Sequence, residues 1–376
     1  MTMKLDDLET PVAVVDLDRL ARNLDRAAKY ANQHGLALRP HIKTHKSPRI
    51  ASEQLKRGAV GVTCATTFEA EVMSEVCDDL LVAYPPVGAR RAERLAALPE
   101  TTRVTVALDS MAAIEQIAAA AAAADRAIGV YVELDLGMHR VGTPSIDTAI
   151  ELARAVAARP PLEFEGIGFY PGHIREPVGD QGSKLAALDA ALRQAVDAFE
   201  RAGLRPSVVS GGSTPTLWQT HELPHVTEFR PGTYVYNDRT TAELRACEWS
   251  DCALTVHATV VSTAVPGQAV IDAGAKALGR EPMRGVDAAE GFGSLEEHPE
   301  VVVKSMSEEH GILDLSRSSW RPQVGERVRV IPNHVCIVVH LNDVIVGARG
   351  EVVETSWPVV ARGRGFSLPV GEPVGA

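Results

Sequence analysis

The sequence of 376 residues lacks several features that mark common classes of protein. No apolar run reaches the roughly 18 to 20 residues that span a bilayer, and the start, MTMKLDDLET, has no apolar segment after a basic one. Positive charge is also in deficit, because 38 Lys and Arg against 49 Asp and Glu give a formal net charge of −11. Nucleic-acid binders normally present a basic face. We therefore expect a cytoplasmic protein without membrane or nucleic-acid partners.

Cysteine is scarce as well. The five residues Cys64, Cys77, Cys247, Cys252 and Cys336 are odd in number and widely scattered, and they include no CxxC pair. This pattern disfavours a disulfide framework. We expect most of these side chains to be small core residues.

What is present is a regular alternation of β-type and helical segments over about 230 residues. Eight short apolar or β-branched runs, separated mostly by amphipathic helical segments, lie at residues 36–44, 60–67, 79–85, 103–110, 128–136, 162–172, 206–213 and 225–234. Eight strands linked by helices favour a (β/α)8 TIM-type barrel, although the count by itself leaves an open doubly wound sheet possible.

After about residue 250 the pattern changes. Segments such as ALTVHATVVSTAV and ERVRVIPNHVCIVVHL alternate at period two with little helix between them. Alternation of this kind predicts strands, so we expect a second, all-β domain.

The first predicted strand ends in the octet RPHIKTHK, residues 39–46. Active sites of α/β barrels lie at the carboxyl ends of the strands. Side-chain alternation would place His41, Lys43 and His45 on one face, with Lys43 pointing into the barrel mouth, where a lysine can form a Schiff base. Most lysines lie on the protein surface, and we expect Lys46 to be a surface residue.

This octet, preceded by TPVAVVDLDRLARNL, resembles the N-terminal region of the alanine racemase-like, fold type III, pyridoxal-phosphate enzymes, most closely the D-serine dehydratase and D-threonine aldolase branch. The resemblance continues in order through ELDLGMHRVG, GFYPGHI, SGGSTPT, FRPGTYVYND, DAGAKAL, SEEHGIL and IPNHVCIVV. It implies that Lys43 carries pyridoxal 5'-phosphate, that the fold is a barrel followed by a β-domain, and that the protein is a homodimer.

The same resemblance sets the expected domain boundaries. Residues 1–18 would supply an N-terminal strand to the β-domain, residues 19–248 the cofactor-binding barrel, and residues 249–376 the C-terminal β-domain with a metal site.

Two glycine-containing loops are candidates for the phosphate of the cofactor. Gly212, Ser213 and Thr214 follow the seventh predicted strand, and Gly232 and Thr233 follow the eighth. Barrels often hold phosphate after these two strands, on backbone N–H groups. Each loop alone is explained as well by a simple turn, but their adjacency favours the phosphate site.

Three further residues are assigned to the pocket through the resemblance. Arg140 corresponds to an arginine near the cofactor ring or the substrate carboxylate, and both roles stay open. Tyr170 and His173 are similar to pocket-lining positions. His173 is a candidate acid or base, because its reference pKa of about 6.5 suits proton transfer at neutral pH. A hydrogen-bonded histidine in a polar loop is the equally plausible alternative.

His334 and Cys336 form the predicted metal site. Two residues apart on a strand they would share one face, and imidazole with thiolate suits Zn²⁺. A bare HxC usually means a core cysteine beside a surface histidine. In the resembling family, however, D-serine dehydratases carry His-x-Cys as zinc ligands, whereas D-threonine aldolases carry His-x-Asp for a harder divalent cation.

Together these features predict a lyase that acts on a small-molecule substrate, a β-hydroxy-D-amino acid. We expect a D-serine or D-threonine dehydratase that releases a 2-keto acid and ammonia, with aldolase cleavage to glycine and an aldehyde as the alternative. Amino-acid racemisation is more remote, because residues 250–376 contain no tyrosine. A non-enzymatic cofactor carrier is also remote, because such carriers lack the β-domain.

Overall fold

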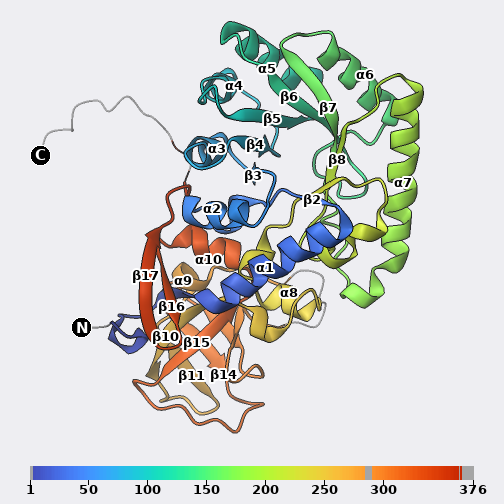
Figure 1. Ribbon diagram of the computed structural model, residues 1–376. Helices are drawn as coiled ribbons and strands as arrows, with labels where there is room; N and C mark the ends of the chain where they lie inside the picture. Colours follow the sequence, from blue (N-terminus) through green and yellow to red (C-terminus); the bar gives the residue numbers. More distant parts are fainter. Residues whose placement is uncertain (1–2, 284–289, 364, 366–376) are drawn as a thin grey trace, which may run out of the picture.

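The computed structural model describes residues 3–283, 290–363 and 365 (Figure 1). An eight-stranded parallel sheet has the strand order β2-β9-β8-β7-β6-β5-β4-β3. Its two ends meet, because the N–H of Thr63 donates to the carbonyl of Pro40 at 2.8 Å and that of Val60 to Leu38 at 2.9 Å. The predicted barrel is therefore confirmed. Its strands are β2 (Ala37–Leu38), β3 (Val62–Cys64), β4 (Asp79–Val82), β5 (Arg103–Leu108), β6 (Ile128–Leu134), β7 (Leu162–Phe169), β8 (Val208–Gly211) and β9 (Glu228–Phe229).

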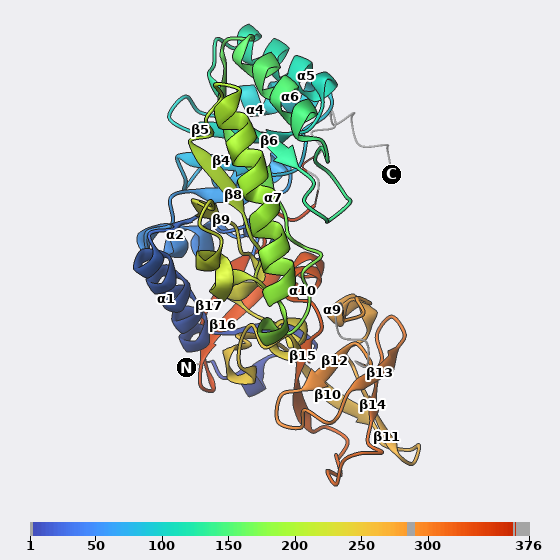
Figure 2. The same cartoon turned by 90° about the vertical axis from the view of Figure 1, so that its right-hand side faces the viewer.

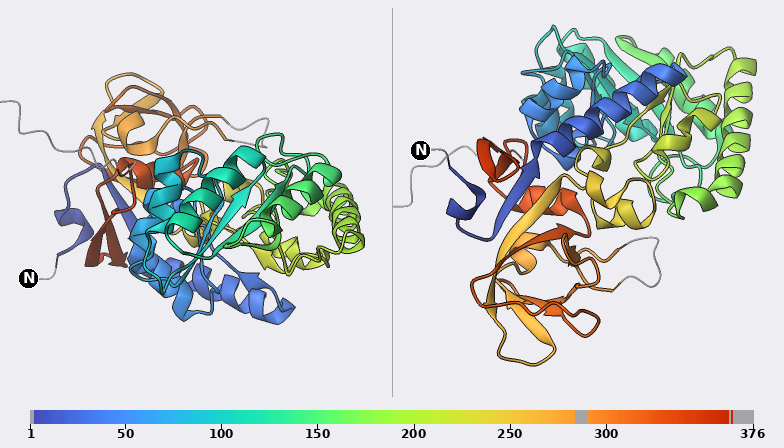
Figure 3. Two further views of the ribbon diagram at one scale, coloured as in Figure 1. Left: turned by 90° about the horizontal axis from the view of Figure 1, so that it is seen from above. Right: turned by 60° about the horizontal axis from the view of Figure 1, so that its bottom comes forward.

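Helices surround the parallel strands when the barrel is seen from above (Figure 3). The first begins where the Asp16 carboxylate accepts the N–H groups of Asp18 and Arg19, and it ends at Gly35 with a φ of 63°. The helices are α1 (Leu17–His34), α2 (Pro48–Lys56), α3 (Thr67–Met73), α4 (Ala89–Ala96), α5 (Met111–Ala123), α6 (Ile146–Ala157), α7 (Gly182–Arg201) and α8 (Arg239–Glu243). Short 3-10 turns that matter for the site are η2 (Ile42–Thr44), η4 (Leu217–Glu222) and η5 (Thr233–Val235).

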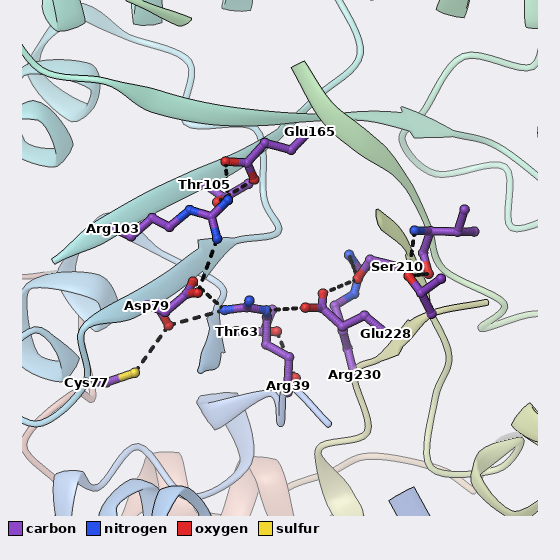
Figure 4. A network of polar contacts seen from close by, with 12 residues as sticks. Arg39, Thr63, Cys77, Asp79, Arg103, Thr105, Glu165, Ser210, Glu228 and Arg230 are labelled. Atoms are coloured by element: carbon purple, nitrogen blue, oxygen red, sulfur yellow. Dashed lines mark hydrogen bonds and ion pairs between the residues drawn. The ribbon is translucent and has the colours of Figure 1, made fainter. Parts of the chain in front are cut away.

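The interior of the barrel is filled with paired charges rather than with apolar side chains alone (Figure 4). The Arg39 guanidinium donates to Asp79 at 2.7 Å and to Glu228 at 2.6 Å, and Arg103 donates to Glu165 at 2.7 Å. Glycine provides the room, since a Cβ on Gly129 would lie 2.1 Å from a Glu165 oxygen. This interior network extends upward to the mouth of the barrel.

The second sheet has nine strands. The N-terminal strand β1 pairs antiparallel with β10 and parallel with β16, so the chain passes through this sheet before α1 leads it into the barrel. Figure 2 shows β11, β13 and β14 at the end farthest from the barrel. The strands are β1 (Val12–Asp16), β10 (Leu254–Ser262), β11 (Gln268–Ile271), β12 (Gly293–Leu295), β13 (Val303–Met306), β14 (Gly311–Asp314), β15 (Arg327–Pro332), β16 (Val344–Arg349) and β17 (Val352–Pro358).

The expected second β domain is confirmed, although two short helices interrupt its strands. It contains the short helix α9 (Ala275–Leu278) and the helix α10 (Val335–Leu341), which lies between the sheet and the barrel (Figures 1 and 2). The run VCIVV is apolar throughout, so its periodicity does not distinguish a strand from a buried helix. In the structure it buries Val335, Val338 and Val339 at helical spacing.

Two expectations based on absences can be compared with the structure directly. All five cysteines are free and buried, in agreement with the predicted lack of a disulfide framework. Among the residues described, no helix combines the length and apolar character needed to cross a membrane.

Candidate active site

Lys43 lies on the turn η2, just after β2 at the carboxyl end of the barrel, and not on a strand as predicted. Strand β2 is short, and Pro40, which has no N–H group, follows it before the chain turns. Lys43 therefore does not share a strand face with its neighbours. Its side chain lines a cavity, with Nζ 5.6 Å from the centre of the Tyr170 ring, whereas His45 is fully buried.

The inner part of this cavity has a volume of about 90 Å³ and is lined by barrel residues. It brings together every residue that was predicted to bind the cofactor: Lys43, Arg140, Tyr170, Gly212, Ser213, Thr214, Gly232 and Thr233. Residues that the sequence analysis did not assign complete it: His41, Ala83, Glu133, Pro215 and Arg230.

The two glycine loops lie against each other at the end of the barrel. The N–H of Tyr234 donates to the Thr214 hydroxyl at 3.2 Å, which connects them. Gly212 has a φ of +99°, and a Cβ on Gly232 would lie 3.0 Å from the Thr44 hydroxyl, so neither position accepts a side chain easily. In the described part of the chain, the N–H groups of Gly212, Thr214, Gly232 and Thr233 donate to no other group. Such donors suit a phosphate.

Two charged side chains form the floor of the inner cavity. Arg230 donates to the Ser210 hydroxyl at 3.2 Å (Figure 4) and to the Phe169 carbonyl at 2.7 Å. Glu133 is 4% exposed, one of its carboxylate oxygens has no partner among the described residues, and burial raises its pKa. The signal that the sequence analysis overlooked is a lone charge in the otherwise apolar strand 128–134.

The outer part of the cavity, about 290 Å³, lies between the barrel and the β-domain. Lys43, Arg140, Tyr170, Ser213 and Thr233 line both parts, so the two are continuous. The Arg140 guanidinium lies 4.7 Å from the centre of the Tyr170 ring. The outer part also contacts Met138, Gly172, Ile174, Arg175, Pro215, Asp238, Thr240, Thr241, Leu244, Glu281, Pro282 and His334.

His334 and Cys336 do not share a strand face, because His334 is the N-cap of α10 and Cys336 lies in its first turn. The two side chains are nevertheless close. The Cys336 sulfur raises the pKa of His334 well above its usual value. Burial by itself raises the pKa of Cys336, but the charges of His334 and Lys43 bring it down to about 7. Cys336 Sγ lies 3.2 Å from the hydroxyl of Thr44, which is the residue next to Lys43.

Asp238 is the most informative residue that the sequence analysis missed. One of its oxygens caps α8 by accepting the N–H of Thr241 at 2.9 Å. The other lies 3.2 Å from His334 Nδ1 and accepts the N–H of Val335 at 3.2 Å. A carboxylate on Nδ1 orients the imidazole and leaves Nε2 for a metal. Its capping role was the available signal, since Asp238 precedes a short polar helix.

A ready-made cage of metal ligands is absent from the residues that the structure describes, since no group of three or more His, Cys, Asp or Glu side chains could hold an ion. The pair His334 and Cys336 would therefore leave coordination positions open. Catalytic metal sites keep such a position for water or substrate.

His173 is the predicted site residue that the structure does not bring into the cavity. Its neighbours Gly172 and Ile174 line the outer part, but its own ring packs against Gly137, where a Cβ would lie 3.0 Å away. Its Nδ1 is buried without a partner in the described ranges, and burial lowers its pKa. The arrangement gives no support to an acid or base role.

Comparison with known families assigns both halves of the chain. Residues 15–240 match the family model described as "Alanine racemase, N-terminal domain". Residues 253–348 match the one described as "Putative serine dehydratase domain".

Similar proteins span nearly the whole chain. A 3-hydroxy-D-aspartate aldolase of Paracoccus denitrificans (strain Pd 1222) is 33% identical, and the match covers 97% of this chain and 95% of that protein. The D-threo-3-hydroxyaspartate dehydratase of Delftia sp. (strain HT23) is 34% identical over 88% of this chain and 91% of its own length.

Solved structures of related enzymes also match nearly the whole chain. A D-threonine aldolase from Filomicrobium marinum superposes with a TM-score of 0.88 at 33% identity, covering 97% of this chain and 99% of that one. A Cys-to-Ala variant of a D-threo-3-hydroxyaspartate dehydratase, described as metal-free, has a TM-score of 0.85 at 30% identity and covers 97% of this chain and all of that one.

Proposed function

This chain belongs to the family that joins an alanine racemase N-terminal domain to a serine dehydratase domain, and we propose that it is a pyridoxal-phosphate- and divalent-metal-dependent lyase of β-hydroxy-D-amino acids. One observation carries the proposal. The amine of Lys43 and the imidazole of His334 line the same cavity, so a group for covalent chemistry and a group for metal binding face one substrate.

The inner cavity fits the cofactor. Its amine is Lys43, and the N–H groups of Gly212, Thr214, Gly232 and Thr233 in the two glycine loops are free to hold a phosphate. The side chains of Tyr170 and Arg140 would form the wall of the cavity beside the ring of the cofactor. When bound, pyridoxal phosphate withdraws electron density from the α-carbon of an attached amino acid.

The part of the outer cavity that His334 lines fits a divalent cation. His334 and Cys336 would be the protein ligands, Asp238 orients the imidazole, and Thr44 contacts the sulfur. A cation there would polarise a substrate hydroxyl. A thiolate ligand favours Zn²⁺ over harder cations.

Lys43 and the pair His334 and Cys336 have different roles in this reaction. The Lys43 amine is the base for the α-proton, because it borders both parts of the cavity. His334 lines the outer cavity and Cys336 lies next to it, and the β-carbon of the substrate and its hydroxyl would extend toward this side. Loss of that hydroxyl after removal of the α-proton gives, after hydrolysis, a 2-keto acid and ammonia.

We favour dehydration because Cys336 stands at the second ligand position. A structure of a related dehydratase, a Cys-to-Ala variant described as being in the metal-free form, supports a metal requirement in the family. Aldol cleavage is the second candidate, and the 33% identity to a 3-hydroxy-D-aspartate aldolase supports it. In that reaction the base removes the proton of the β-hydroxyl instead, and the Cα–Cβ bond breaks.

A combined spectroscopic and product experiment tests the proposal. The purified protein should show the absorbance of bound cofactor, and borohydride reduction followed by peptide mapping should label Lys43. With added Zn²⁺ and D-serine or D-threonine, the expected products are pyruvate or 2-ketobutyrate, whereas glycine with acetaldehyde from D-threonine would indicate the aldolase. Label on another lysine, or no turnover of any β-hydroxy-D-amino acid, would refute the proposal.

A further inference from the structure

A buried polar contact joins the turn η2 of the barrel to the helix α10 of the second domain. The hydroxyl of Thr44 lies 3.2 Å from Cys336 Sγ. Thr44 is fully buried, and Cys336 is 9% exposed. The same turn carries Lys43, and the same helix begins after His334. The contact therefore connects the segment with the reactive amine to the segment with the candidate metal ligands.

The Thr44 hydroxyl is available to this sulfur. Among the described residues, Cys336 is its only hydrogen-bond partner. A second contact between a cysteine and a threonine, Cys247 with Thr241 at 3.6 Å, differs because the Thr241 hydroxyl already donates to the Asp238 carbonyl at 2.9 Å. A buried hydroxyl without a partner is costly, so the sulfur is what satisfies Thr44.

The backbone around Thr44 fixes the position of its side chain. The N–H groups of His45 and Lys46 both donate to the Ile42 carbonyl, at 3.0 and 2.8 Å, which closes the turn. On another side Gly232 packs so closely that a Cβ there would lie 3.0 Å from the Thr44 hydroxyl. A β-branched side chain is also stiff at its first torsion. The hydroxyl is therefore held at the sulfur before any ligand binds.

The protonation state of Cys336 decides the direction of the hydrogen bond. A neutral cysteine and a threonine hydroxyl can each donate in such a contact. Cysteine binds metals as the thiolate, which has no proton to give. With a cation on Cys336, the Thr44 hydroxyl is therefore the donor and the sulfur the acceptor.

We propose that Thr44 is a positioning residue of the metal site, whose hydroxyl donates to the Cys336 thiolate and holds the sulfur in place for the cation. This inference rests on the proposed function for the presence of the metal. Each candidate ligand then has its own supporting residue, since Asp238 lies on Nδ1 of His334. A barrel residue next to Lys43 thus sets the position of a ligand that the second domain provides.

Three substitutions at one position test the role of the hydroxyl. Thr44→Val and Thr44→Ala remove it, with and without a group of similar size in its place, whereas Thr44→Ser keeps it. In competition with a chelator, on protein that contains pyridoxal phosphate, the first two should bind Zn²⁺ about 10- to 100-fold more weakly, and Thr44→Ser should stay near the wild type. Thr102→Val is the matched control, because Thr102 is 2% exposed and precedes β5 at the opposite end of the barrel.

A spectrum distinguishes a hydrogen bond to the sulfur from a purely structural role. In the Co²⁺-substituted protein, the difference spectrum against the Zn²⁺ form isolates the sulfur-to-cobalt charge-transfer band. A hydrogen bond withdraws electron density from the sulfur, so its loss should move this band to lower energy in Thr44→Val and Thr44→Ala. The band should keep its position in Thr44→Ser and Thr102→Val.

The outcomes separate failure of this inference from failure of the proposed function. If the wild-type protein binds neither Zn²⁺ nor Co²⁺, the metal-dependent function is refuted, and the role of Thr44 with it. If the wild type binds both, but Thr44→Val and Thr44→Ala keep its affinity and its band, only the role of Thr44 is overturned. Loss of cofactor absorbance together with metal in these variants would also overturn it, because Thr44 would then support the turn that carries Lys43 rather than the sulfur.

Discussion

The inner and outer parts of the cavity differ in where their residues come from. The inner part is lined by residues 41–233, all from the barrel and its loops. The outer part adds Asp238 and Thr240 from the chain after the barrel, Glu281 and Pro282 beside α9, and His334 at the start of α10. Under the proposed function the barrel would hold the cofactor, and the second domain would supply the ligands of the metal that polarises the substrate hydroxyl. Variants on each side should therefore have separable effects.

The largest effect is expected from Lys43→Ala on the inner side. Without the amine, covalent attachment of the cofactor is impossible, so both the absorbance of bound cofactor and the activity should disappear. Absorbance spectra and turnover of the purified variant measure this. Lys56→Ala, at a side chain that is 70% exposed, is the control and should match the wild type. Cofactor absorbance that survives in Lys43→Ala would contradict the assignment.

Cys336→Ala on the outer side should separate the two functions. The variant should keep the absorbance of the cofactor while activity falls by at least about a hundredfold, because Lewis-acid assistance contributes several kcal/mol. Metal analysis should show loss of the bound cation. Cys77→Ala, which removes a buried thiol 3.2 Å from the Asp79 carbonyl, is the control and should keep its metal. Loss of cofactor together with metal would argue against separate inner and outer sites.

Asp238→Asn also tests the outer side of the cavity, but with a smaller expected effect. An amide no longer favours the Nδ1–H tautomer of His334, so metal affinity should fall about 10- to 100-fold while excess Zn²⁺ restores most of the activity. The asparagine oxygen can still cap α8, but the amide NH2 would then face the N–H of Val335, so the variant should also lose some stability. Titration of activity with Zn²⁺ measures the effect. An unchanged titration curve would show that Asp238 serves only as a helix cap.

The last effect is on stability in acid rather than on catalysis or metal binding, and here the two regions should behave alike. Burial lowers the pKa of His45, in the Lys43 segment, to about 3, and that of His257, in β10, to about 4. An unfolded histidine takes up a proton near pH 6.5, so each site lowers stability as the pH falls from about 6.5 to about 4, by up to ~1.4 kcal/mol per pH unit.

Replacement of one buried histidine should flatten this dependence. In urea unfolding at pH 7.5, 6, 5 and 4.5, His257→Gln should show a shallower loss of stability than wild type. His310→Gln, at an exposed position of the same domain, should follow the wild-type curve. Parallel curves for wild type and His257→Gln would contradict the assignment.

The sequence pattern correctly predicted the barrel, and the residues that it assigned to the cofactor lie together at one end of it. All eight predicted strands are present, and the residues assigned to the cofactor line one cavity. The pattern failed where local rules compete. Lys43 lies on a 3-10 turn because the chain turns after Pro40, and Cys336 lies on a helix because an apolar run fits either structure. His173 sits next to two lining residues, yet its side chain points elsewhere.

Order along the chain therefore sufficed to predict the fold class, and the family resemblance of its motifs assigned Lys43, the two glycine loops and the His334–Cys336 pair to one site. The period of apolar residues predicts the strands and helices because it depends on local backbone preferences. Tertiary structure alone decided that α10 brings His334 and Cys336 to within reach of η2 and that Asp238 orients the imidazole. Such contacts join residues far apart in the chain, and their energies depend on packing and burial, which no local pattern encodes.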